Sequence, residues 1–183
     1  MFSKFQDLQV DLLKTVENGD CFFDALGLFL LPVWDRRALT AWRQDLVYRM
    51  YKQQLLNQAQ YNHYVRPHVW ADFDLVFATV RLFNRPFCVI QYESPNAVTL
   101  IRPYSVEWTP EQIVYLVYCH GNHFTTISFT TISRPLDMVK RLKRMEQVGM
   151  PEEQPGCVVT HGNLSTLLED PRRRANRKTR KRA

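Results

Sequence analysis

The hydrophobic pattern of this chain changes its period once, near the middle, and that change limits the folds that the chain can adopt. Before it, apolar residues recur every three or four positions over 35–57 and 70–83, as on one face of a helix. After it come short runs rich in β-branched and aromatic residues, separated by turn residues. These runs are 87–92, 97–101, 113–118 and 124–129. Helices followed by a sheet predict an α+β domain with a small, mostly antiparallel sheet packed between helices.

Two more helices are expected from the same pattern. One covers 22–31, directly after a cysteine, and Pro32 ends it; the other covers 137–147. Within the helix over 35–57, the apolar stripe comprises Leu39, Trp42, Leu46 and Met50. We expect Arg36, Arg43 and Arg49 elsewhere on the surface of this helix.

The positive charge of the chain is concentrated at its C-terminal end. The formal net charge is +6, but residues 171–183 hold 8 of the 24 lysines and arginines and no acid, which leaves 16 basic and 18 acidic residues elsewhere. A nearly neutral body excludes a nucleic-acid footprint spread over the whole domain. We expect one domain over 1–149 and a low-order extension over 150–183. Its basic tail, 172–182, is predicted to contact an import receptor or nucleic acid, or simply to stay solvated.

The sequence points to a reducing compartment. It has no apolar run of the ~20 residues that a membrane span requires, and its first residues lack the pattern of a signal peptide. Four cysteines in 183 residues do not form the dense framework of a disulfide-stabilised domain. We therefore expect free thiols, no cofactor, a monomer, and a location in the cytoplasm or the nucleus.

The segment around the first cysteine has the layout of an activated thiol. Glu17-Asn18-Gly19-Asp20 forms a polar turn, and Cys21 opens the apolar, helix-like run after it. Backbone N–H groups at a helix N-terminus favour a thiolate. The amides of Gly19, Asp20 and Cys21 are candidates for an oxyanion hole. The alternative is that Cys21 is an ordinary buried core cysteine, which is the commonest fate of a free cysteine.

A histidine about a hundred residues later supplies the matching base. In the run Tyr118 to Phe124, His123 leaves a turn and enters a β-like segment. A cysteine and a distant histidine are the minimum for nucleophilic acyl chemistry. Two alternatives remain at this turn: His123 is a solvated surface residue, with His120 as its rival, or Cys119, His120 and His123 bind zinc with a fourth ligand from elsewhere.

Three segments, in order, resemble the ovarian-tumour (OTU) family of cysteine proteases. They are the cysteine motif at 18–25, the helix and strand over 70–91, and the histidine motif at 117–124. The resemblance implies an OTU-like fold of the papain superfamily and a deubiquitinase. It implies Cys21 as nucleophile and His123 as general base, with ubiquitin or a ubiquitin-like modifier and ubiquitinated proteins as partners.

The chain departs from the family pattern at the third catalytic position. Family members often have an Asp three residues before the cysteine, or an Asp or Asn two residues after the histidine; here these positions are Asn18 and Thr125. We expect Asn18 to orient His123 through its side-chain carbonyl, as an amide does in papain-like proteases. Alternatively, Asn18 lines the oxyanion pocket. A carboxylate that faced the thiol would raise the pKa of the thiol, so Asp20 is expected to point away from it.

Loss of the third carboxylate keeps two other functions open. One is an OTU-like module that binds ubiquitin and has weak or no catalytic activity. The other is a cysteine protease, of a virus or a mobile element, that processes a polyprotein with the same Cys21 and His123.

Overall fold

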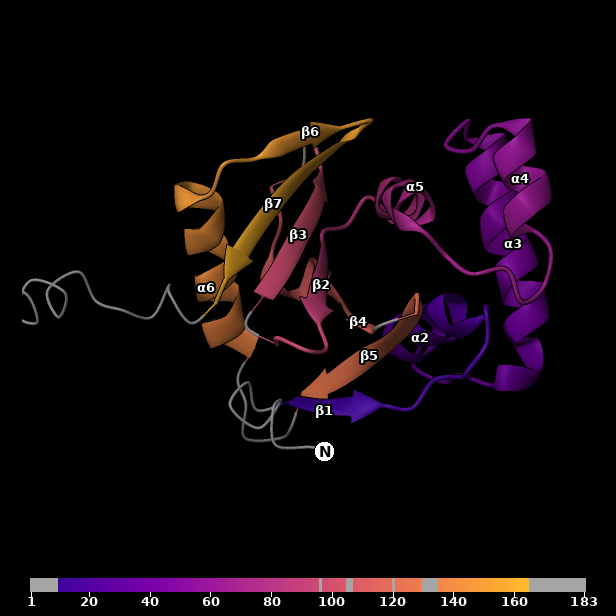
Figure 1. Cartoon of the computed structure of the whole chain (residues 1–183), viewed down its shortest axis with the longest axis horizontal. Coiled ribbons are helices and arrows are strands. Elements are labelled where there is room, and N and C mark those ends of the chain that lie inside the picture. The colour runs from indigo at the N-terminus through magenta and orange to yellow at the C-terminus, as the bar shows by residue number, and fades with distance from the viewer. Residues whose placement is uncertain (1–9, 96, 105–106, 120, 130–134, 165–183) are drawn as a thin grey trace, which may run out of the picture.

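The computed structural model describes residues 10–95, 97–104, 107–119, 121–129 and 135–164. The basic tail 172–182 and His120 lie outside these ranges, so the predictions for them stay predictions. Within the ranges, a seven-stranded sheet in the order β1-β5-β4-β2-β3-β7-β6 runs through the domain, with helices on both of its faces (Figure 1). The strands are β1 (Val10–Leu13), β2 (Phe87–Gln91), β3 (Ala97–Pro103), β4 (Val114–Cys119), β5 (His123–Phe129), β6 (Glu152–Gln154) and β7 (Cys157–Asn163).

The sheet is mostly antiparallel, as the sequence predicts. Among the strand pairs in the described ranges, β2 and β4 form the parallel one, and the other five are antiparallel. The α-helices are α2 (Cys21–Leu30), α3 (Leu39–Lys52), α4 (Gln58–Tyr64), α5 (Phe73–Phe83) and α6 (Pro135–Val148), with short 3₁₀ turns η1 (Arg36–Ala38) and η2 (Pro110–Gln112). Mixed helices and one sheet confirm the α+β class.

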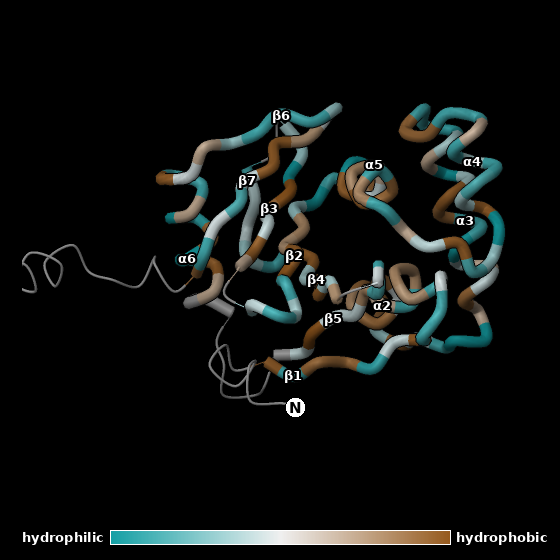
Figure 2. The backbone as a smooth tube through the Cα atoms, in the orientation of Figure 1, coloured by the Kyte–Doolittle hydropathy of each residue, from teal (hydrophilic) through white to brown (hydrophobic). Residues whose placement is uncertain are grey.

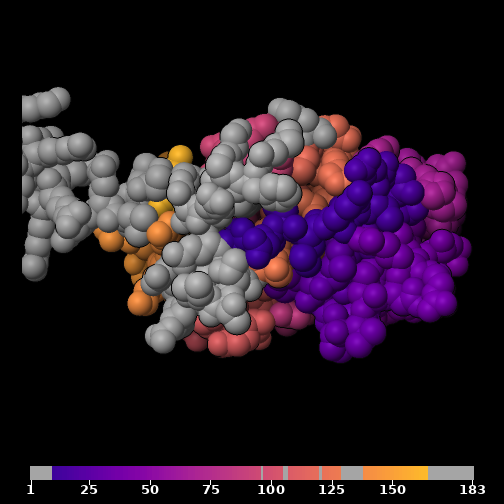
Figure 3. Space-filling model, turned by 90° about the horizontal axis from the view of Figure 1, so that it is seen from below, coloured from indigo at the N-terminus to yellow at the C-terminus, as the bar shows by residue number. Residues whose placement is uncertain are grey.

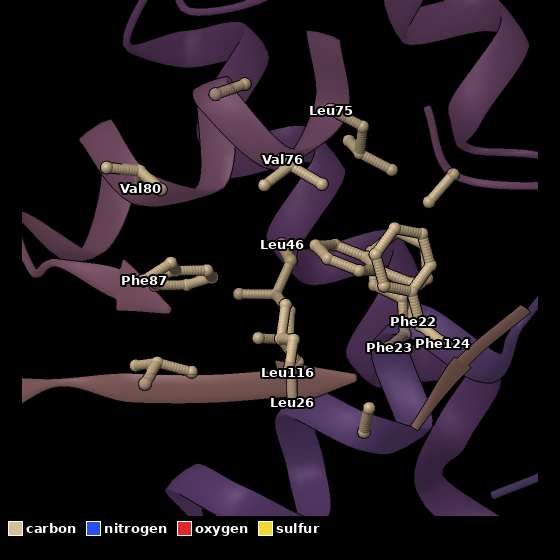
Figure 4. Packing of buried hydrophobic residues seen from close by; sticks show 14 of the residues in the cluster. Phe22, Phe23, Leu26, Leu46, Leu75, Val76, Val80, Phe87, Leu116 and Phe124 are labelled. Carbon is tan, nitrogen blue, oxygen red and sulfur yellow. The ribbon is translucent and has the colours of Figure 1, made fainter. Parts of the chain in front are cut away.

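The central strands are buried on both faces, which explains their continuous apolar runs. Phe87 and Val89 of β2 contribute to a core with α2, α3 and α5, whereas Cys88 and Ile90 contribute to a second core with α6. Figure 2 shows the hydrophobic colour concentrated on these strands and the hydrophilic colour along the outer turns of α3 and α4. The first core is the larger one, and its aromatic and aliphatic side chains interlock between α2, α5 and the sheet (Figure 4).

Residues 152–163 differ from the expected low-order extension after residue 149. Residues of β7 pair with β3 along its whole length, from Ala97↔Asn163 to Pro103↔Cys157, and Cys157 and Val159 are buried in the first core. The apolar residues of β7 are limited to its first three positions, and Thr160, His161, Gly162 and Asn163 follow them, so its sequence does not resemble a buried strand; pairing with β3 supplies the order. The sheet therefore extends to residue 163.

One arginine of α3 is placed on the wrong face by the sequence prediction. Arg43 has no exposed surface, while Arg49 is exposed as expected. In a helix, Arg43 shares a face with Leu39 and with Val47, four residues before and after it, and both are buried. The guanidinium of Arg43 stays charged in this interior because acceptors surround it, as described below.

Candidate active site

The first turn of α2 carries Cys21 at the junction of the helix layer and the sheet. Cys21 is the first helical residue, and its side chain is fully buried. The ring of Phe22 packs edge-on against Phe124 of β5, with ring centroids 5.2 Å apart, and Phe22 and Phe124 lie together in Figure 4. Aromatic pairs of this geometry are favourable beyond the area they bury. This contact ties the start of α2 to the start of β5.

The sulfur of Cys21 reaches the backbone next to His123. The N–H of Phe124 donates to Cys21 Sγ at 3.2 Å, and the carbonyl oxygen of Asn122 lies 4.0 Å from the same sulfur. His123 lies between these two residues and begins β5, opposite Cys119 of β4. Asn122, with φ of 65°, adopts the left-handed conformation that Asn tolerates. The structure thus brings Cys21 to the strand end where His123 lies.

The polar turn before Cys21, residues 17–20, is here called the nucleophile loop, and a buried ion pair holds it. The guanidinium of Arg43 is 2.5 Å from Asp20 Oδ1 and also donates to the carbonyl oxygens of Gly19, Tyr64 and Val69. The second oxygen of Asp20 is 2.7 Å from His68 Nδ1. The carboxylate of Asp20 is therefore engaged by these two side chains, although its charge still contributes to the raised pKa of the Cys21 thiol.

Gly19 is required by close backbone packing against the segment around His68. A Cβ atom at position 19 would lie 2.0 Å from the carbonyl oxygen of His68 and 2.2 Å from its carbonyl carbon. These are backbone atoms, which cannot rotate away. Glycine is therefore the residue that lets the nucleophile loop and residues 68–69 lie against each other.

Asn18 makes a different contact from the expected one. Its Oδ1 accepts the N–H of Asp20 at 2.9 Å, and its backbone carbonyl accepts the N–H of Cys21 at 3.1 Å. Asn side chains readily close such turns on their own backbone. Among the described residues, no hydrogen bond joins Asn18 to His123. Asn18 thus shapes the nucleophile loop, and two of the three expected oxyanion donors, those of Asp20 and Cys21, already donate within the loop.

The ring of His123 instead contacts a residue that the sequence prediction did not include. Its Nε2 lies 3.2 Å from Thr15 Oγ1, in the segment after β1. Thr125, the family position two residues after the histidine, turns its hydroxyl to the carbonyl oxygen of Leu13. Nothing in the sequence around Thr15 predicts this contact, because the contact depends on how β1 pairs with β5.

Burial shifts the two proposed reactive groups in opposite directions. It raises the pKa of the Cys21 thiol, although the N–H of Phe124 acts against this shift, and it lowers the pKa of His123, although the charge of Glu17 acts against that shift. Both shifts favour the uncharged form. At neutral pH the resting pair is therefore a thiol and a neutral imidazole.

Other features of the described residues bear on the remaining expectations. All four cysteines are free thiols; Cys119 is half-buried, and the other three are buried. No group of three or more possible metal ligands occurs within the ranges given above; His120 of the zinc alternative lies outside them. Among the described helices, none has both the length and the apolar character needed to cross a bilayer.

Comparison with solved structures relates this architecture to known domains. No protein-family model and no curated protein matches the sequence. The OTU domain of OTUD1 superposes with a TM-score of 0.54 at 13% identity, covering 69% of this chain and 91% of that domain. The viral OTU domain protease from Taggert virus gives 0.53 at 10% identity, covering 72% and 86%. The Hazara virus OTU bound to ubiquitin gives 0.51 at 12% identity, covering 67% and 82%.

These similarities confirm the fold that the sequence motifs suggested. Each alignment covers most of the length of the other domain, so the likeness is not limited to a single motif. Its identity is low, and what it establishes is the overall arrangement of helices and strands. This chain has an OTU-like fold.

Proposed function

We propose that this chain is a cysteine isopeptidase that hydrolyses the bond between the C-terminus of ubiquitin, or of a ubiquitin-like modifier, and a lysine. The observation that carries the proposal is the 3.2 Å hydrogen bond from Phe124 N–H to Cys21 Sγ, directly beside His123. The fold adds support, because one structural neighbour is a viral OTU bound to ubiquitin and another is a viral OTU domain protease.

In the proposed reaction, His123 takes the proton of the Cys21 thiol as the sulfur attacks the carbonyl carbon of the modifier's C-terminus. The new S–C bond gives a tetrahedral oxyanion. The C–N bond then breaks, and the imidazolium returns its proton to the leaving lysine amine. Water attacks the remaining thioester with His123 as base, which releases the modifier and the thiol. Burial favours the uncharged form of both groups at rest, so the thiol proton has to move to His123 in the course of the reaction.

The amides of Gly19, Asp20 and Cys21 are the proposed donors to the oxyanion. Two of them donate to Asn18 in the resting structure, so the oxyanion must replace Asn18 oxygens as their acceptor. Arg43 and the close packing of Gly19 hold the backbone of the loop in place during this exchange. We propose that Asn18 acts on this loop and not on the imidazole.

Ubiquitin carrying a C-terminal electrophile tests the proposal. A covalent adduct is expected with the wild-type chain, and none with Cys21→Ala. Cys119→Ala is the matched control, because Cys119 is the more exposed thiol near the same hairpin and its loss should leave the adduct intact. An adduct that depends on Cys119, or one that persists in Cys21→Ala, would contradict the proposal. Cleavage of the eight diubiquitin linkages would then define the substrate preference.

One observation favours a second function, a ubiquitin-binding module with weak catalysis. The thiol of Cys21 is fully buried, and burial raises its pKa, so the nucleophile is poorly activated in the resting structure. Reversible binding of ubiquitin that is equal in wild type and Cys21→Ala, without any adduct, would support the module and reject the isopeptidase.

A further inference from the structure

The contact between Thr15 and His123 is part of a hydrogen-bond chain with a fixed direction. Thr15 Oγ1 lies 2.8 Å from the carbonyl oxygen of Phe124 and 3.2 Å from His123 Nε2. A hydroxyl has one proton to donate, and a carbonyl oxygen only accepts. The Thr15 proton therefore goes to Phe124, and Oγ1 is left with lone pairs toward the ring. The contact between Thr15 Oγ1 and His123 Nε2 is then a hydrogen bond only if Nε2 carries a proton and donates it to Oγ1.

This direction determines which nitrogen of the ring is free. In a neutral imidazole with its proton on Nε2, Nδ1 has the lone pair and is the base. Nδ1 is bonded to the ring carbon nearest the backbone, so it stays close to the start of β5. The next amide along that strand, Phe124 N–H, is the one that contacts Cys21 Sγ.

The position of Thr15 follows from the strand register. Leu12 pairs with Ile127 and Leu13 with Thr126, and continuing this antiparallel register by two residues places Thr15 opposite Phe124. The β1 segment and the residues after it, in indigo, run across the face of the molecule shown in Figure 3 beside orange residues of the chain's later strands. The register thus sets Thr15 one residue away from His123.

Further contacts fix the segment that carries Thr15. The carbonyl oxygen of Lys14 accepts from Arg36, and the N–H of Val16 donates to Asp24 Oδ2 at 2.9 Å. Asp24 is fully buried in α2, three residues after Cys21, and it also pairs with Arg36 at 2.9 Å. Helix α2 therefore positions both groups: its first residue is Cys21, and its fourth residue, Asp24, binds the segment that carries Thr15.

Other candidates for orienting the ring are engaged elsewhere or act differently. Asn18 Oδ1 accepts from Asp20, and the hydroxyl of Thr125 donates to Leu13. Burial lowers the pKa of His123 and the charge of Glu17 only opposes that shift, and no hydrogen bond between Glu17 and His123 occurs in the described residues. Thr15 is therefore the group in hydrogen-bond contact with Nε2.

We propose that Thr15 is a positioning residue that holds His123 in the tautomer with its proton on Nε2, so that Nδ1 serves as the base for Cys21. This inference rests on the proposed isopeptidase function for its kinetic consequences, but the tautomer itself is a property of the resting protein. Thr15 thus takes the place of the side chain that orients the histidine, with a neutral hydroxyl oxygen where a carboxylate or an amide is used elsewhere.

Substitutions at Thr15 separate a positioning role from a structural one. Thr15→Val removes the hydroxyl at nearly constant volume and is expected to lower kcat by roughly 10- to 100-fold with KM little changed, because the base is no longer held in the productive geometry. Thr15→Ser keeps the hydroxyl and should restore most of the rate. Thr126→Val is the matched control: on β5, the strand that carries His123, it removes a buried hydroxyl that donates to the backbone carbonyl of Tyr115 on β4.

Nitrogen NMR of the ¹⁵N-labelled full chain reads the tautomer directly and needs no ubiquitin activity. The wild type should show His123 protonated on Nε2, and Thr15→Val should shift the tautomer ratio toward Nδ1, whereas Thr126→Val should not; His123→Ala assigns the signals. Protonation on Nδ1 in the wild type, or an unchanged ratio in Thr15→Val, would overturn the proposal even if the chain cleaves ubiquitin. Absence of any ubiquitin adduct would instead reject the proposed function and leave the NMR result decisive for Thr15.

Discussion

The two halves of the candidate site are held by different kinds of interaction. On the nucleophile side, a buried guanidinium and a buried carboxylate, Arg43 and Asp20, fix the loop backbone. On the histidine side, uncharged groups hold the ring: the hydroxyl of Thr15 and the pairing of β5 with its neighbours. The difference matches what each side must do. A loop that presents amides must stay in one conformation, whereas the Thr15 oxygen can accept a hydrogen bond from Nε2 whether the ring is neutral or protonated.

The largest effect is expected on the charged side. Arg43→Met leaves Asp20 buried without its guanidinium and removes the donor to Gly19, Tyr64 and Val69. Breaking one partner of a buried ion pair costs about 3–5 kcal/mol of the free energy of unfolding. Urea denaturation measures this loss. Arg49→Met is the control, because its pair with Asp45 is exposed and 3.8 Å long; equal losses for the two variants would show that Arg43 is not a special support.

A smaller effect is expected from the turn that Asn18 closes. Asn18→Ala removes the acceptor of Asp20 N–H, so the nucleophile loop loses one local hydrogen bond, worth about 1 kcal/mol. We expect about a tenfold lower kcat/KM on a ubiquitin substrate, with the acid limb of the pH profile unmoved, because Asn18 does not contact the ring. Thr125→Ala should change turnover little. A displaced acid limb in Asn18→Ala would restore Asn18 as the residue that orients His123.

These contrasts also show what the sequence could and could not predict. The cysteine and histidine motifs are local, and the runs of β2 and β4 are apolar on both faces, so all four are visible in a single sequence. Arg43 is read as a surface residue because its acceptors come from residues 19, 20, 64 and 69, which only the fold brings together. Thr15 is missed for the same reason: it lies next to a four-residue edge strand, and its partner is more than a hundred residues away.

The pH dependence of kcat/KM tests whether the histidine side is neutral at rest. His123 must be unprotonated to act as base, and burial lowers its pKa below the usual 6.5. Activity should therefore persist below pH 6.5 and fall only as the pH drops through this lowered pKa. The pKa of Cys21 is raised above 9.0, which moves the alkaline limb upward and widens the profile. An acid limb at or above pH 6.5 would mean that a charged partner such as Glu17 governs the ring.

The smallest effect is expected at His68, the exposed partner of the Asp20 carboxylate. The His68 side chain is 66% exposed although its Nδ1 lies 2.7 Å from Asp20, and exposed ion pairs contribute only about 0–1 kcal/mol. Its backbone matters more, because its N–H donates to Asp20 and its carbonyl packs against Gly19. His68→Asn keeps the left-handed backbone that position 68 adopts, with φ of 61°, so its unfolding free energy should stay within about 1 kcal/mol of wild type. A loss as large as that of Arg43→Met would show that the imidazole holds the nucleophile loop as strongly as the buried guanidinium does.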